Sequence, residues 1–236
     1  MNKQILDRNQ WYLFRNQLRN NYDYNDNWRN VIELFRLRIE NYYLSPINKI
    51  KHPAALKGEG FTILTIQCAL IEMFAAFKSG KIHNHRKTAV SPSFEYKQAD
   101  DCFIKFLQTE AIFENHFYSM RSGRKRLNVP FSAKDFYGSV RCGLMHEART
   151  KGSWVINAKK AYPGGERIFI TQDSGTIRVD RNILNNLLTE YLQNYLAELS
   201  AQNQNGNSLR RLFGRKLDHF YDIQPDSQNY DWWEDR

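Results

Sequence analysis

The stretch from Phe61 to Phe77 limits most strongly how this chain can fold, because it is apolar on nearly all sides. Gln67 and Glu72 interrupt it, and it falls short of the roughly 20 apolar residues that a bilayer span needs. We therefore expect a helix buried at the centre of a globular core. Gly80 should end this helix, because glycine readily adopts the left-handed conformation that closes a last turn.

Apolar residues at helical spacing predict further helices around this centre. They should cover residues 27–44, about 98–116, and the segment from 181 to 199. Pro46 and Pro53 should break the first, and Asp180 should cap the last.

Another helix should begin at Ser132, since Ser132 and Asp135 have the spacing of a capping box. It should continue to about Arg149, with one apolar face. That face carries Phe136, Val140 and Leu144.

After Gly152 the pattern changes to that of short strands separated by the turn sequences PGGE and DSG. They predict a small sheet or hairpin over about 153–180. The expected fold class is therefore mainly α: an antiparallel helical bundle with a small β insertion before the last long helix. We expect a helical extension over 1–26, the main domain over 27–201, and a polar linker with a basic stretch and an acidic, aromatic tail over 202–236.

The charge favours a polyanionic partner. The 236 residues include 34 Lys and Arg against 25 Asp and Glu, a formal charge of +9, so nucleic acid is the first partner to test. Eight basic and two acidic residues lie between Arg121 and Lys151. The residues expected to contact RNA phosphates are Arg121, Arg124, Lys125, Arg126, Arg149 and Lys151.

Other partners and compartments are less favoured. The N-terminus lacks the features of a secretory signal, and the three cysteines have no CxxC spacing. We therefore expect a cytoplasmic protein without a membrane span, a metal or another cofactor. His83 and His85 are interpreted as loop residues, because no further ligand cluster accompanies them.

One segment carries candidate chemistry: GSVRCGLMHEAR, residues 138–149. Its Arg141-x4-His146 spacing resembles the Rx4-6H signature of the HEPN superfamily, helical domains that recur in toxin, phage-defence, CRISPR-associated and RNA-processing ribonucleases. The resemblance covers about residues 30 to 200, and the motif carries nearly all of its specificity. It implies a HEPN-like bundle in which Arg141 and His146 are catalytic.

The chemistry of these two residue types fits RNA cleavage. RNA carries its own nucleophile, the 2′-OH, so a base, an acid and a cation for the charged phosphorane suffice. Histidine, with an ordinary pKa near 6.5, can exchange protons at neutral pH, and arginine offers a fork of donors that matches phosphate oxygens. We expect a metal-independent endoribonuclease that leaves 2′,3′-cyclic phosphate and 5′-OH ends.

The spacing sets a geometric condition. Five residues on an ideal helix turn two side chains roughly 140° apart and about 7.5 Å along the axis. The resemblance implies a homodimer, in which two copies of the pair share one composite site. It also implies a setting in phage defence or a toxin system, with an antitoxin or defence protein as a further partner.

Several assignments have plainer alternatives. Glu147 is either a solvated charge at the helix end or a support for His146 or Arg141. Cys142 is, with Glu147, a candidate supporting residue of the site. It stands where the family often has Asn, Asp or His, which favours the alternative of a non-catalytic HEPN-fold module that binds RNA or protein. A DNA-binding regulator is less favoured, because no helix-turn-helix pair is evident. The basic residues Arg210, Arg211, Arg215 and Lys216 could bind RNA or pair with the acidic tail.

Overall fold

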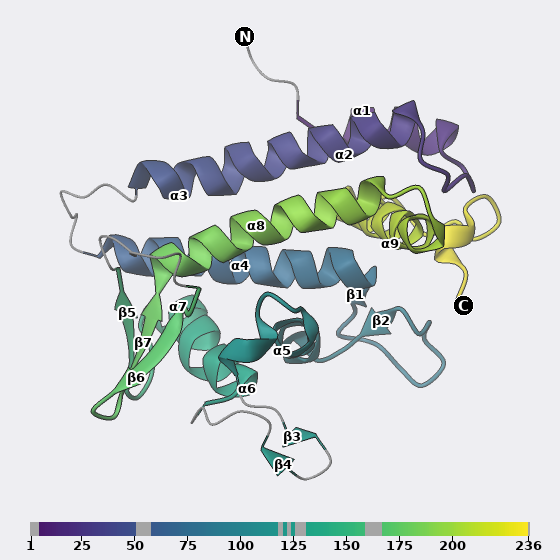
Figure 1. The fold of residues 1–236 in the computed structure, drawn as a ribbon. Helices are drawn as coiled ribbons and strands as arrows, with labels where there is room; N and C mark the ends of the chain where they lie inside the picture. Colours follow the sequence, from purple (N-terminus) through teal and green to yellow (C-terminus); the bar gives the residue numbers. More distant parts are fainter. Residues whose placement is uncertain are drawn as a thin grey trace. The chain divides into compact units, whose positions relative to one another are not determined.

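A computed structural model describes residues 5–50, 58–117, 120–121, 124–125, 131–158 and 167–235 (Figure 1). The described part is mainly helical with a small sheet, as the sequence predicts. The chain divides into two compact units, one of residues 1–42, 73–99 and 192–236 and the other of residues 43–72 and 100–191. Two long helices, α4 (Glu59–Ser79) and α8 (Arg181–Ser200), each start in the second unit and end in the first.

The first unit is built from helices that are distant in sequence. They are α1 (Arg8–Gln17), α2 (Asp26–Ile39), α9 (Gln204–Phe220) and the short η4 (Asp231–Trp233), together with the ends of α4 and α8. Phe35, Phe77 and Phe213 form an aromatic core, with ring centroids 4.9 to 5.6 Å apart. Two short parallel strands, β1 (Ile82–His83) and β2 (Glu95–Tyr96), complete the unit.

The second unit combines short helices with a sheet. Its helical segments are α3 (Ser45–Ile50), nearly all of α5 (Ala99–Thr109), η2 (Glu114–His116), α6 (Ala133–Phe136), η3 (Tyr137–Arg141) and α7 (Cys142–Glu147). Its strands are β3 (Met120–Arg121), β4 (Arg124–Lys125), β5 (Trp154–Asn157), β6 (Ile170–Asp173) and β7 (Thr176–Asp180). Strands β5, β7 and β6 lie side by side in that order, with β5 parallel and β6 antiparallel to β7 (Figure 1).

Local signals in the sequence correctly mark several boundaries. Ser132 and Asp135 form the expected capping box, and Gly80 follows α4 with a φ of 60°. The Ser174-Gly175 pair joins β6 to β7 with positive φ at both residues, as a tight hairpin requires. The Asp180 carboxylate accepts the N–H groups of the first turn of α8 at 3.0 Å.

Pro46 does not end its helix as predicted. After α2 the chain makes a π turn, η1 (Glu40–Leu44), and continues as α3 through Pro46. The π turn interrupts the regular hydrogen-bond ladder, so Pro46 stands in the first turn of a new segment, where its missing N–H costs little. The helix predicted over 98–116 is also shorter, because α5 stops at Thr109 and only residues 114–116 turn again.

The prediction of a polar linker at the beginning of the segment 202–236 is also wrong. Most of residues 202–208 form the start of α9. The Asn203 side chain caps this helix by accepting the Gly206 N–H at 2.9 Å. The buried Arg210 guanidinium then joins α9 to the end of α8, donating to the carbonyl oxygens of Leu199 and Ala201. The sheet therefore precedes the penultimate long helix and not the last one.

The basic stretch and the acidic tail are parts of one folded arrangement. Arg211 donates to the carbonyl oxygens of Asp231 and Glu234, and Arg215 donates to that of Trp232 at 2.5 Å. These contacts favour an internal role for the basic residues. They hold the tail through its backbone rather than through its carboxylates.

The helix α4 alone, among the described residues, is long and apolar enough to cross a membrane by length and composition. In the most apolar 18-residue stretch of this helix, 56% is buried within the protein. This burial is typical of a helix in a protein core.

Candidate functional site

The candidate motif lies on one interrupted helix of the second unit. The α6 segment passes into the π turn η3, in which the Cys142 N–H donates to the carbonyl of Tyr137, and then continues as α7. Phe136, Val140 and Leu144 are all buried, so the predicted apolar face anchors the whole segment. A π turn adds one residue and turns the following side chains by about 100° relative to an uninterrupted α-helix.

Arg141, the last residue of the π turn, is held by an acidic residue of the central helix. Its Nη2 lies 2.8 Å from Glu72 Oε2, and its Nε donates to the same oxygen at 3.3 Å. Its side chain is 16% exposed, so it is largely buried but not closed off from solvent. Burial opposes the charge of Arg141, but the hydrogen bonds and charge of Glu72 outweigh it and raise the pKa of the guanidinium.

Tyr137 and two cysteines complete the surroundings of Arg141. The guanidinium carbon lies 5.4 Å from the centroid of the Tyr137 ring. Burial raises the pKa of the Cys68 thiol to about 12, so this buried residue of α4 is not a nucleophile at neutral pH. Burial also raises the pKa of the Tyr137 hydroxyl to about 12. Cys142 is half-buried directly after Arg141 and is a free thiol.

His146 lies near the end of α7, and its side chain is exposed. Within the described residues it makes no hydrogen bond or ion pair, so its ring is open to solvent. Arg141 and His146 are therefore in contrasting surroundings, one paired with Glu72 and the other free. On an ideal helix the five-residue step turns the two side chains roughly 140° apart, so we expect that one copy does not bring the two groups together.

The chain reverses sharply after His146. Ala148 ends α7 in the left-handed conformation, with a φ of 52°, and the Arg149 N–H donates to the Gly143 carbonyl at 3.2 Å. The Lys151 N–H then reaches back to the Ser139 carbonyl at 2.9 Å. Gly143 permits this reversal, because a Cβ there would collide with the Arg149 carbonyl oxygen.

The reversal gathers three of the predicted charged residues on one exposed surface. Glu147 pairs with Arg149 at 2.9 Å and with Lys151 at 2.6 Å. Hydrogen bonds from Lys151 and Arg149 lower the pKa of the Glu147 carboxyl. In this structure Glu147 therefore supports neither His146 nor Arg141, and it partly neutralises two residues that we predicted to bind RNA.

The rest of the predicted basic surface is described only in part. Arg121 pairs with Arg124 through the backbones of β3 and β4, and Lys125 belongs to the same short ladder. The side chains of these three residues, and all of Arg126, lie outside the described part of the chain. The nearby aromatics Phe117 and Phe131 are buried in the core, with 1% and 3% of their surface exposed, so neither is free to stack on a base.

Sequence reasoning missed Glu72. Its signal was present, because a carboxylate in an otherwise apolar helix needs a partner. The partner lies 69 positions away, and only the packed structure identifies it as Arg141.

No described group of three or more His, Cys, Asp and Glu side chains is arranged to hold a metal ion. His83 is exposed in the short strand β1, and its Nε2 lies 3.0 Å from the Lys97 carbonyl oxygen. His116 is a structural residue, with its Nε2 2.7 Å from the Arg167 carbonyl oxygen. Burial lowers the pKa of its ring.

A comparison with protein-family models, one with curated proteins and one with solved structures each found no match.

Proposed function

We propose that this protein is a metal-independent endoribonuclease of the HEPN type, with Arg141 and His146 as its catalytic residues. The proposal depends on the orientation and the exposure of these two side chains, which lie five residues apart. Arg141 is oriented by Glu72 and partly open, and His146 is exposed without an internal partner. A cation of fixed orientation and an accessible imidazole supply the charge stabilisation and the proton transfer that 2′-OH attack needs.

The proposal requires a second copy of the chain. A two-fold axis beside α7 would place two histidines and two arginines around one phosphodiester. Met145 is 49% exposed next to His146 and offers an apolar contact for such an interface. The basic residues from Arg121 to Lys151 would hold the RNA strand, and Glu147 would release Arg149 and Lys151 to phosphates as RNA binds.

The resemblance places the protein in phage defence or a toxin system, with an antitoxin or another defence protein as a partner. The cytoplasmic location is proposed from the N-terminus and the cysteine spacing. The expected products are 2′,3′-cyclic phosphate and 5′-OH ends.

The test is RNA cleavage in EDTA with end-group analysis. His146→Ala should reduce the cleavage rate by about 10²- to 10⁴-fold, the usual contribution of a general acid or base. Arg141→Ala should reduce it by about 10²- to 10³-fold, the usual effect of losing a donor that stabilises the transition-state charge. His85→Gln is the matched control, because His85 is also exposed but lies in the first unit. Glu72→Gln should reduce cleavage less than Arg141→Ala, since it loosens the guanidinium without removing it.

Two results would overturn the proposal. One is a strict requirement for Mg²⁺, and the other is a His146→Ala protein that cuts RNA as fast as the wild type. Circular dichroism of each variant shows whether a loss of activity reflects a loss of fold.

A second candidate is a non-catalytic module that binds RNA or protein. The Arg141–Glu72 ion pair favours it, because a partly buried arginine with a carboxylate partner is also a common structural element. If the wild type and His146→Ala bind RNA equally and neither cuts it over a long incubation, this candidate is the correct one.

A further inference from the structure

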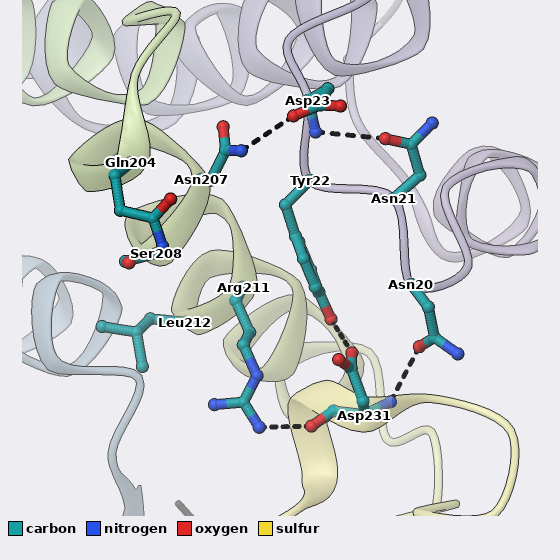
Figure 2. A pocket seen from close by; sticks show the side chains of 10 residues that line it. All are labelled: Asn20, Asn21, Tyr22, Asp23, Gln204, Asn207, Ser208, Arg211, Leu212 and Asp231. Atoms are coloured by element: carbon teal, nitrogen blue, oxygen red, sulfur yellow. Dashed lines mark hydrogen bonds between the residues drawn. The ribbon is translucent and has the colours of Figure 1, made fainter.

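The first unit contains a pocket that the proposed catalysis does not use. Its volume is about 570 Å³, within the range of small-molecule sites. Figure 2 shows its two walls, the connection from Asn20 to Asp23 on one side and the first half of α9 on the other. Asp231 of η4 and Arg211 of α9 lie at one end.

One wall of the pocket carries an aromatic ring, and the other carries a single aliphatic side chain among polar ones. Tyr22 projects into the space between the two walls, and its hydroxyl is fixed by a hydrogen bond to the Asp231 carboxylate (Figure 2). Leu212 lines the α9 side. A flat aromatic ring anchored at its hydroxyl is a stacking platform for a planar ligand.

Polar groups that line the pocket have unused capacity. Gln204 and Ser208 are exposed on α9, and neither side chain makes a hydrogen bond within the described residues. Asp23 uses its Oδ1 to accept from Asn207 at 2.8 Å, and its second oxygen accepts nothing from the described residues. An amide, a hydroxyl and a carboxylate oxygen are thus available to a ligand.

The charge of the lining excludes a phosphate as the bound group. Asp23 and Asp231 contribute two carboxylates against the single guanidinium of Arg211. The free carboxylate oxygen of Asp23 instead favours a ligand that donates hydrogen bonds.

We propose that this pocket binds a nucleobase with an exocyclic amino group, stacked on Tyr22, and that adenine fits it best. Asn and Gln amides match the adjacent donor and acceptor of adenine, and a carboxylate accepts from a base amino group. The site is independent of the proposed cleavage chemistry.

The experiment is calorimetric titration of the full chain with adenosine, cytidine, inosine and uridine. Adenosine should bind saturably, and cytidine, whose base also carries an exocyclic amino group, should bind more weakly than adenosine. Inosine, which replaces the amino group of adenosine by a carbonyl, should bind about tenfold more weakly, and uridine should also be weak. The double variant Gln204→Ala/Ser208→Ala should weaken adenosine binding by about tenfold. Asn205→Ala is the matched control, because Asn205 is an exposed amide on the same helix that does not line this pocket.

The proposal is overturned if adenosine does not bind, if inosine and uridine bind as tightly as adenosine, or if the double variant binds adenosine as the wild type does. An unchanged unfolding midpoint shows that the double variant is folded. The same titration with Arg141→Ala separates the two proposals, since adenosine binding should persist there even if RNA cleavage is absent or abolished.

Discussion

Three histidines of this protein lie in three different environments. His116 is buried against backbone carbonyl oxygens, His219 is half-buried beside Lys216, and His146 is exposed. Of these three, only His146 can meet a substrate without a change of structure. His83 and His85 are exposed as well, so the spacing from Arg141 together with exposure makes His146 the candidate for proton transfer.

The surroundings of His219 predict a pH dependence of stability. Burial, together with the positive charge of Lys216, lowers the pKa of His219 to about 4 from an ordinary value of 6.5. Between these values the unfolded chain binds a proton that the folded chain does not, so stability is lost as the pH falls from about 6.5 to 4. Urea unfolding from pH 7.5 to 5 should show a falling midpoint for the wild type and a smaller fall for His219→Gln.

The control for this prediction is His85→Gln, whose histidine is exposed. It should follow the wild-type curve. Parallel curves for the wild type and His219→Gln would show that His219 does not contribute.

At the same scale, the sequence identified the residue types of the candidate site but not their pairings. The Arg141-x4-His146 spacing is local and can be read directly, whereas the Arg141–Glu72 ion pair joins two helices. By contrast, the pairs of Glu147 with Arg149 and Lys151 are local, two and four residues along the chain, yet the sequence left Glu147 open between a solvated charge and a support for the site.

At the scale of single elements, some helix and strand boundaries follow from local signals in the sequence and others do not. The capping box at Ser132 and the Ser174-Gly175 turn were predicted correctly, because each depends on hydrogen bonds between near neighbours. The π turns at 40–44 and 137–141 were not predicted, since they adjust the helix to tertiary packing. The start of α9 was missed because asparagine and glutamine resemble a linker in composition, while Asn203 acts as a helix cap.

The end of α7 yields a stability prediction. Ala148 holds a left-handed conformation that glycine adopts without strain, so Ala148→Gly should stabilise the protein by about 0.5–1 kcal/mol. Gly143→Ala should destabilise it, because its Cβ would collide with the Arg149 carbonyl oxygen. Urea unfolding of both variants measures the two effects. Equal midpoints for the two would contradict the assigned geometry.

Across the whole molecule, the formal charge of +9 overstates the basic surface open to a polyanion. Arg210, Arg211 and Arg215 use their guanidinium groups on backbone carbonyl oxygens of the first unit. Arg149 and Lys151 share Glu147. Composition alone does not separate these internal roles from binding roles.

The tail is an integral part of the first unit. Trp232 and Trp233 both donate their indole N–H to Asp218 Oδ2 at 2.9 Å, while Trp11 and Arg15 donate to Oδ1. Asp218 is fully buried, and the four donors satisfy its charge.

Deleting residues 224–236 should therefore unfold the first unit at 25 °C. The deletion removes two buried tryptophans, each worth about 3–5 kcal/mol, a sum comparable to the stability of a typical domain. It also leaves Asp218 with only two of its donors. Hydrogen exchange measures the effect as a loss of protection in α1 and α9. Retained protection in both helices would contradict this role of the tail.

The four donors around Asp218 also affect how the chain folds during its synthesis. Trp11 and Arg15 are made early, but two of the groups that complete their surroundings are residues 232 and 233. At roughly 5–20 residues per second, the α1 helix waits about 10–50 s on the ribosome before its partners exist. During that interval its tryptophan lacks its contacts with Asp218 and Trp232, so the nascent chain should be a client of chaperones that hold exposed apolar segments.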